Sequence, residues 1–140
     1  MKAGRFSVTA LVRSGSKGTL PAGLTTANVS FDNEEALVSV LRGQQFLVIT
    51  LASRAPPDVH SKLVRAAGKA GVPYVMPNAY GSDIQNKSLR DEDLYGAGAL
   101  QRCEEVEIMG SSYVAMVCGF WIEWSLALGE VSQHSTLSSL

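Results

Sequence analysis

Four short segments of this 140-residue chain hold residue types that could bind a phosphate-bearing ligand, and each lies at the carboxyl end of a predicted strand. The first begins with Arg13, whose planar guanidinium matches a phosphate, and continues through Ser14 to Lys17, a second point charge. A basic residue at the tip of such a strand suits an adenosine 2′-phosphate, whereas an acidic one suits a free 2′-hydroxyl. A solvated arginine that merely ends a strand is an equally good interpretation of Arg13.

The other three segments are less specific. Asp32 is more simply a helix N-cap than a ligand for adenine. Leu51 and Ala52 lie where the sugar and phosphates of a dinucleotide would pass, although ordinary strand packing also explains them. Asn78 and Tyr80 could hydrogen-bond a carboxamide or a substrate oxygen, or belong to a plain loop.

The residue patterns of two common catalytic classes are absent from the sequence. None of the four tyrosines is followed four positions later by lysine, so the Tyr-x-x-x-Lys pair that lowers a tyrosine pKa for proton transfer is missing. No Gly-x-Ser-x-Gly elbow occurs, which disfavours a hydrolase. Cys103 and Cys118 lie outside any Cys-x-x-Cys pair and far from both histidines, so we predict no metal site and two reduced, mostly buried thiols.

Strand and helix patterns alternate along the chain, which is typical of a parallel α/β sheet. The helices are predicted to begin with Asp32 as N-cap, at the Pro56–Asp58 turn and near Gly98, and to end at Gly43, Gly71 and Gly110. Residues 84–93 are predicted to be irregular. The segment 46–52 is apolar almost throughout, as in a strand covered on both faces. The predicted strands are 7–13, 25–31, 46–52, 74–76 and 113–118.

The strand at 7–13 should be the second of its fold, because the Gly-rich turn that cradles a pyrophosphate belongs before it. Only Met1–Phe6 precedes it, and we therefore expect an incomplete sheet. In the complete fold, a further strand would pair between those that start at Ser7 and Phe46. These two strands are expected either to stay about two strand spacings apart, on the order of 10 Å, or to pair directly.

Composition excludes several function classes. The 12 basic and 13 acidic residues leave a net charge of −1, so no nucleic-acid footprint is visible. No apolar run is long enough for a membrane span, and the N-terminus has no signal-peptide pattern. A cytoplasmic location is the default, with the nucleus as the other option. Phe120, Trp121 and Trp124 are more simply packing residues of a helix than the lining of a substrate pocket.

Over roughly residues 1–128 the sequence resembles the NmrA-like family, the isoflavone reductase-like atypical short-chain dehydrogenases. The resemblance is carried most specifically by the run Pro77-Asn78-Ala79-Tyr80-Gly81-Ser82-Asp83, together with Val8–Arg13, Phe31–Leu37, Gly71–Met76 and Cys118–Trp121. It implies a Rossmann-like, doubly wound parallel sheet that binds NADP(H). The family's Gly-rich loop is missing, so residues 1–128 are predicted to be a partial domain and residues 129–140 a disordered tail.

The resemblance leaves two functions open. Its reductase members carry a catalytic lysine in the helix after the Asp83-type loop, but the matching stretch 99–103 has none. We therefore favour a dinucleotide-binding redox sensor or regulator, with binding impaired in this chain and no catalytic residue assigned. The alternative is an NADPH-dependent oxidoreductase that acts on a small molecule. A third interpretation is an interaction module that uses the aromatic residues at 120–124.

Overall fold

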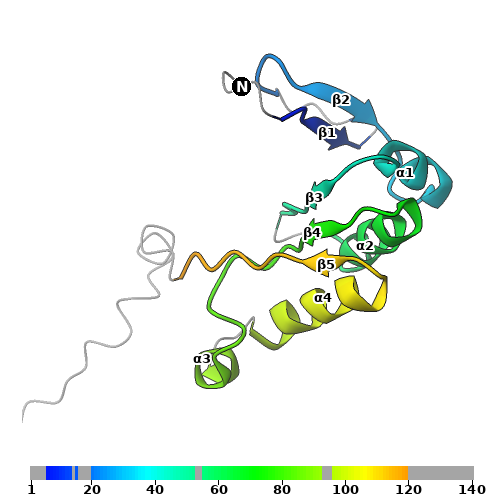
Figure 1. The fold of residues 1–140 in the computed structure, drawn as a ribbon. Coiled ribbons are helices and arrows are strands. Elements are labelled where there is room, and N and C mark those ends of the chain that lie inside the picture. Colours follow the sequence, from blue (N-terminus) through cyan, green and yellow to red (C-terminus); the bar gives the residue numbers. More distant parts are fainter. Residues whose placement is uncertain (1–5, 14, 16–19, 53–54, 93–95, 120–140) are drawn as a thin grey trace, which may run out of the picture.

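The computed structural model describes residues 6–13, 15, 20–52, 55–92 and 96–119 (Figure 1). Strands and helices alternate, which confirms the predicted α/β class. The order is β1 (Thr9–Val12), β2 (Thr25–Asn28), α1 (Glu34–Leu41), β3 (Phe46–Val48), α2 (Asp58–Ala70), β4 (Tyr74–Met76), α3 (Lys87–Glu92), α4 (Gly96–Ile108) and β5 (Ser112–Tyr113).

The five strands form two parallel sheets. β1 pairs with β2 from Thr9↔Thr25 to Val12↔Asn28, while β3 pairs with β4 and β4 with β5. All these pairs are parallel, as predicted. β1 and β3 are not hydrogen-bonded to each other, so direct pairing, one of the two expected outcomes, does not occur.

One helical layer holds the two sheets together. α1 packs on α2, and α2 packs on α4, on one side of the strands (Figure 1). The core beneath these helices is continuous: Val29 after β2, Leu47 of β3 and Val75 of β4 belong to one buried cluster with Leu37 of α1 and Val106 of α4. Burial of this shared apolar surface is what keeps β1 and β2 beside the second sheet.

The other face of the β3–β4–β5 sheet is exposed in the described part of the chain. Leu47 is 8% exposed, but its neighbours Phe46 and Val48 are 42% and 53% exposed. Phe46 stacks on Tyr74, its register partner, with the ring centroids 6.4 Å apart. The prediction of a strand covered on both faces is therefore wrong for β3, because the described helices lie on one side only.

Helix α1 begins one residue later than predicted. Its N-cap is Asn33, whose side chain accepts a hydrogen bond from the Ala36 N–H at 3.0 Å. The predicted N-cap, Asp32, instead forms an ion pair with Lys62 of α2. Helix α2 ends as predicted, with Gly71 in the left-handed conformation at φ 76°.

Two further predictions need correction. Helix α3 occupies most of the stretch predicted to be irregular, and the Asn86 side chain caps it by accepting from the Leu89 N–H. Cys103 is buried as expected, but Cys118 is exposed. Phe120, Trp121 and Trp124, predicted to pack in a helix, and the predicted disordered tail at 129–140 lie outside the described residues.

None of the helices in the described ranges is long and apolar enough to cross a membrane. Within the same ranges, no cluster of three His, Cys, Asp or Glu side chains could hold a metal ion.

His60 of α2 is a buried titratable residue facing α4. Its Nδ1 lies 3.3 Å from Oε2 of Glu105, and its buried Nε2 has no hydrogen-bond partner among the described residues. Burial lowers the pKa of His60 below its usual 6.5, and the hydrogen bond to Glu105 raises it only in part. The fold therefore favours neutral His60.

Protonation of His60 should therefore destabilise the protein in mild acid. The free energy of unfolding is expected to fall as the pH is lowered from about 7 to about 5, because the unfolded chain binds this proton more tightly. Urea unfolding of His60→Gln should lose this dependence. Glu105→Gln should enlarge it, since Glu105 raises the pKa of His60. An unchanged pH dependence in His60→Gln would exclude His60 as its source.

Candidate functional site

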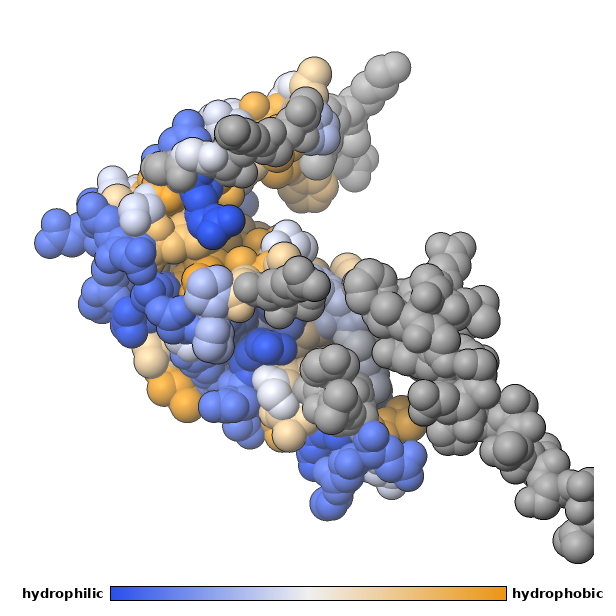
Figure 2. All heavy atoms as spheres, turned by 180° about the vertical axis from the view of Figure 1, so that it is seen from behind, coloured by the Kyte–Doolittle hydropathy of each residue, from blue (hydrophilic) through white to orange (hydrophobic). Residues whose placement is uncertain are grey.

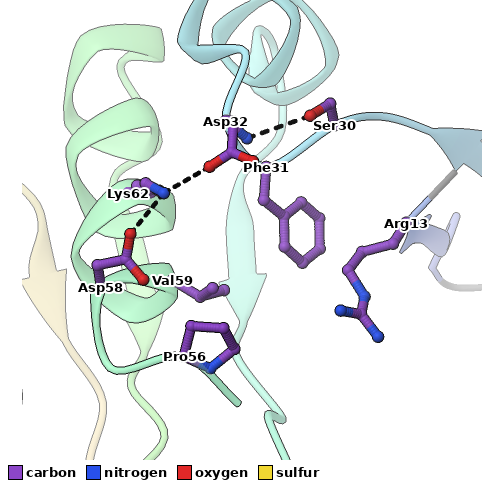
Figure 3. A pocket seen from close by; sticks show the side chains of 8 residues that line it. All are labelled: Arg13, Ser30, Phe31, Asp32, Pro56, Asp58, Val59 and Lys62. Atoms are coloured by element: carbon purple, nitrogen blue, oxygen red, sulfur yellow. Dashed lines mark hydrogen bonds and ion pairs between the residues drawn. The ribbon is translucent and has the colours of Figure 1, made fainter.

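An open pocket of about 330 Å³ lies where β1, β2 and the N-terminus of α2 meet (Figure 3). In parallel α/β sheets, ligands bind outside the carboxyl ends of the strands. The Arg13 segment and the Asp32 segment, which were predicted from the sequence, therefore meet in one pocket, although they belong to different loops. The pocket is lined by Arg13, Ser30, Phe31, Asp32, Pro56, Asp58, Val59 and Lys62.

Arg13 follows the last residue of β1 and extends along one wall of the pocket, opposite the helix α2 wall (Figure 3). Its side chain is exposed, and it forms no ion pair within the described part of the chain. The Arg13 guanidinium can therefore bind an anionic ligand in the pocket without first breaking an ion pair with a carboxylate. Ser14 and Lys17, the neighbouring predicted ligands, lie outside the described residues.

The opposite wall is a three-residue charge network. Lys62 Nζ lies 2.6 Å from Oδ1 of Asp32 and 2.5 Å from Oδ2 of Asp58. The hydrogen bonds to Asp32 and Asp58 raise the pKa of Lys62, and the bond to Lys62 lowers the pKa of Asp58. Asp32 is thus held at the pocket rim by α2.

The sequence analysis did not identify Lys62 as a residue of the pocket. The i,i+4 spacing of Asp58 and Lys62 signals their ion pair. The link from Lys62 to Asp32 spans 30 residues and depends on how α1 packs against α2.

Phe31 supplies an apolar surface between these two charged walls. Its ring is partly buried against the core and lines the pocket between Arg13 and Lys62 (Figure 3). A flat aromatic face beside charged groups can stack a planar heterocycle whose polar substituents reach the rim. The pocket therefore combines a surface for a base with a cation for a phosphate.

The remaining four predicted ligands lie at the carboxyl ends of β3 and β4, in a second cluster. The Leu51 N–H donates to Oδ1 of Asn78 at 3.0 Å, and the Tyr80 hydroxyl donates to the Ile49 carbonyl at 2.9 Å. These bonds give Asn78 and Tyr80 a structural role that joins the two strand ends. Ala52 is exposed and lines no wall of the Arg13 pocket.

Two further features describe this second cluster. The Arg102 side chain of α4 donates to the Asn78 carbonyl at 3.2 Å, so the loop after β4 is fastened from the helix side as well. Burial raises the pKa of Tyr80, which keeps its hydroxyl protonated near neutral pH. A hydroxyl in that state can donate a hydrogen bond but is no ready base.

Comparison with known proteins gives a consistent result. Residues 1–101 match a family model described as NAD(P)H-binding. The oxidoreductase aprR of Aspergillus flavus is 28% identical over 144 residues, which cover 95% of this chain and 48% of that protein.

The fold is similar to that of solved reductases. An isoflavone reductase has a TM-score of 0.63 at 19% identity, covering 86% of this chain and 43% of its own. The structure of AtPrR2 with NADP+ and (+)pinoresinol has a TM-score of 0.60 at 22% identity, covering 84% and 39%. The Escherichia coli quinone oxidoreductase QOR2, complexed with NADPH, has a TM-score of 0.58 at 22% identity, covering 78% and 38%. The predicted Rossmann-like fold is confirmed, and the chain spans less than half the length of these proteins.

Proposed function

This chain belongs to the NAD(P)H-binding family, and we propose that it binds NADP(H) with the adenosine half of the dinucleotide in the Arg13 pocket. Arg13 binds the 2′-phosphate, the adenine stacks on Phe31, and Asp32 lies at the edge of the base. Ser14 and Lys17, which follow Arg13 in the chain, add contacts to the same phosphate.

One observation carries this proposal. Of the two described cations that line the Arg13 pocket, Arg13 alone lies outside an ion pair, and it is at the carboxyl end of β1. Lys62, the other described cation of the pocket, is neutralised by two carboxylates. A phosphate beside Arg13 can form charge-assisted hydrogen bonds to its planar fork. A ribose without that phosphate gains no such contact.

The rest of the dinucleotide crosses the carboxyl ends of β3 and β4. Leu51 and Ala52 border its sugar and phosphates, and the loop with Asn78 and Tyr80 lies at the nicotinamide end. Oδ1 of Asn78 already accepts a hydrogen bond from the Leu51 N–H. The loop therefore contributes mainly by fixing the position of the surface against which the nicotinamide ring lies.

Binding by this chain is weak, because the pocket has a poor pyrophosphate anchor. Pyrophosphates bind to free N–H groups at a helix N-terminus. The helix that borders the pocket, α2, has Pro57 as its N-cap, preceded by Pro56 and followed by Asp58. Proline offers no N–H donor, and an aspartate in the first turn repels an anion.

The same site favours a redox sensor or regulator over an enzyme. In the stretch where the reductase members have a lysine, this chain has Arg102, and its guanidinium is bonded to the Asn78 carbonyl. A regulatory protein is then the partner that responds to the bound dinucleotide. An NADPH-dependent oxidoreductase that acts on a small molecule is the second candidate, favoured by the reductase folds above.

Calorimetric titration of the full chain with NADPH tests the proposal. We expect a dissociation constant near or above about 1 mM, equivalent to roughly −4 kcal/mol, and weaker binding of NADH. Micromolar binding of NADPH would show that the chain has a phosphate anchor that the described pocket does not contain. Oxidation of NADPH in the presence of carbonyl substrates would favour the oxidoreductase over the sensor.

A further inference from the structure

The Asp32 carboxylate, which lines the Arg13 pocket, is held in place from another helix. Its side chain is 83% exposed, and an exposed carboxylate normally exchanges among several rotamers. Here Oδ1 of Asp32 lies 2.6 Å from Nζ of Lys62, and the Asp32 N–H donates to Oγ of Ser30 at 3.3 Å. Asp32 is therefore fixed at both its backbone and its side chain.

Lys62 is well anchored for holding this carboxylate. Its side chain is only 26% exposed, and Nζ also forms an ion pair with Oδ2 of Asp58, one helical turn earlier in α2. The two residues that follow it in α2, Leu63 and Val64, are buried in the core. Because the ammonium contacts two carboxylates and its helix is fixed by the core, Lys62 restricts where the Asp32 side chain can lie.

The bond to Lys62 leaves the second oxygen of Asp32, Oδ2, available to a ligand. No described residue donates a hydrogen bond to this oxygen. Figure 3 shows the Asp32 carboxylate between Lys62 and the Phe31 side chain, and Figure 2 shows the face of the molecule seen from behind, where hydrophilic side chains cover much of the surface. A base stacked on Phe31 presents its edge to Oδ2. An exocyclic amino group at that edge can donate to Oδ2, whereas a carbonyl there meets a second acceptor.

Removal of the Lys62 ammonium would change this geometry. Asp32 and Asp58 both lie within hydrogen-bonding distance of the same nitrogen, so two carboxylates would face each other without it. Like charges at such a short separation repel each other, and the exposed side chain of Asp32 is free to turn toward water. Asp32 would then lose the orientation that keeps Oδ2 at the edge of the base.

We propose that Lys62 is a positioning residue of the adenosine site, and that it selects a purine with an exocyclic amino group by holding Oδ2 of Asp32 at the edge of the base. Lys62 acts through Asp32, because its own ammonium is already bonded to two carboxylates. Adenine carries such an amino group, and hypoxanthine has a carbonyl in its place. The inference rests on the proposed function, since it requires the base to stack on Phe31.

NMR titrations of the isotope-labelled full chain with NADP+ and with its hypoxanthine analogue test this inference. The two ligands differ only in the base, so the ratio of their dissociation constants measures recognition of the base alone. One hydrogen bond corresponds to a preference of about 3- to 10-fold for NADP+. Lys62→Met should abolish this preference and retain the folded spectrum. Any change in the attraction for the 2′-phosphate affects both ligands equally and leaves the ratio unchanged.

Further variants separate positioning from a merely structural role. Lys62→Arg keeps the charge and the donors, so it should restore the preference for NADP+. Asp32→Ala should abolish the preference by itself. Adding Lys62→Met to Asp32→Ala should not change the ratio further, because Lys62 acts only through Asp32.

Lys69→Met is the matched control. Lys69 is also a lysine of α2 that is bonded to a carboxylate, with Nζ 2.6 Å from Oε2 of Glu34, but it does not line the Arg13 pocket. Its replacement removes the same charge from the same helix and should leave the preference for NADP+ unchanged.

Three results would overturn the inference. Equal affinity of the unmodified chain for both ligands would show that the edge of the base is not recognised. A preference that survives in Lys62→Met, or in Lys62→Gln as a second neutral variant, would show that Asp32 needs no positioning residue. Absence of shifts at Arg13 and Phe31 with both ligands would overturn the proposed function as well, whereas the first two results would leave it standing.

Discussion

Replacing Arg13 by alanine is expected to weaken NADPH binding about 10- to 150-fold while leaving NADH binding nearly unchanged. Charge-assisted hydrogen bonds contribute roughly 1.5–3 kcal/mol, and only NADPH carries the 2′-phosphate. The measurement is best made on a chimeric chain with a Gly-rich strand–turn–helix unit before Met1. That unit supplies phosphate donors and brings both dissociation constants into a measurable range.

Arg42→Ala is the matched control for this experiment. Arg42 is also an exposed arginine, but it follows α1 and does not line the Arg13 pocket. Its replacement removes the same charge and should change neither affinity. Equal losses of NADPH and NADH binding in Arg13→Ala would show that Arg13 supports the structure of the β1 end instead of recognising the phosphate.

A second large effect is expected at Gly68, where α2 crosses the end of α4. A Cβ atom there would lie 2.2 Å from the Met109 carbonyl oxygen, so the two backbones would have to separate. Gly68→Ala is expected to lower the free energy of unfolding by about 1–3 kcal/mol, as overpacked cores do. Urea unfolding measures this change.

Gly98→Ala is expected to raise the free energy of unfolding, which is the opposite of the effect expected for Gly68→Ala. Gly98 lies in α4, and an added Cβ would meet open space. Alanine is the better helix former, so this variant should gain about 0.4–1 kcal/mol. Stabilisation by both substitutions would contradict the close approach of α2 and α4.

The parts of the fold that depend on local signals could be predicted from the sequence. The strand Tyr74–Met76 and the end of α2 at Gly71 lie where expected. A short apolar run between Gly71 and Pro77 leaves little choice of element, and glycine adopts the left-handed C′ conformation without strain.

The start of α1 depends on a contact that the local sequence does not contain. Asp32 and Asn33 are both good N-caps. The ion pair of Asp32 with Lys62 holds that carboxylate toward α2, and Asn33 becomes the cap. Such a choice requires knowledge of how α1 packs on α2.

The exposed face of β3 has a similar explanation. The apolar sequence Phe46-Leu47-Val48 is the same whether one layer or two cover the strand. The exposure of Phe46 and Val48 depends on which side the helices occupy. The roles of Asn78 and Tyr80 likewise depend on the β3–β4 pairing, which places both next to the end of β3.

The most direct test of the proposed site is NMR chemical-shift mapping of the NADPH titration on the isotope-labelled full chain. The largest shifts are expected at the backbone amides of Arg13, Phe31 and Asp32, and NADH at the same concentration should produce smaller shifts there. Shifts confined to the α1–α2 surface around Glu35 and Arg42, or equal shifts with NADH at Arg13, would contradict recognition of the 2′-phosphate in this pocket.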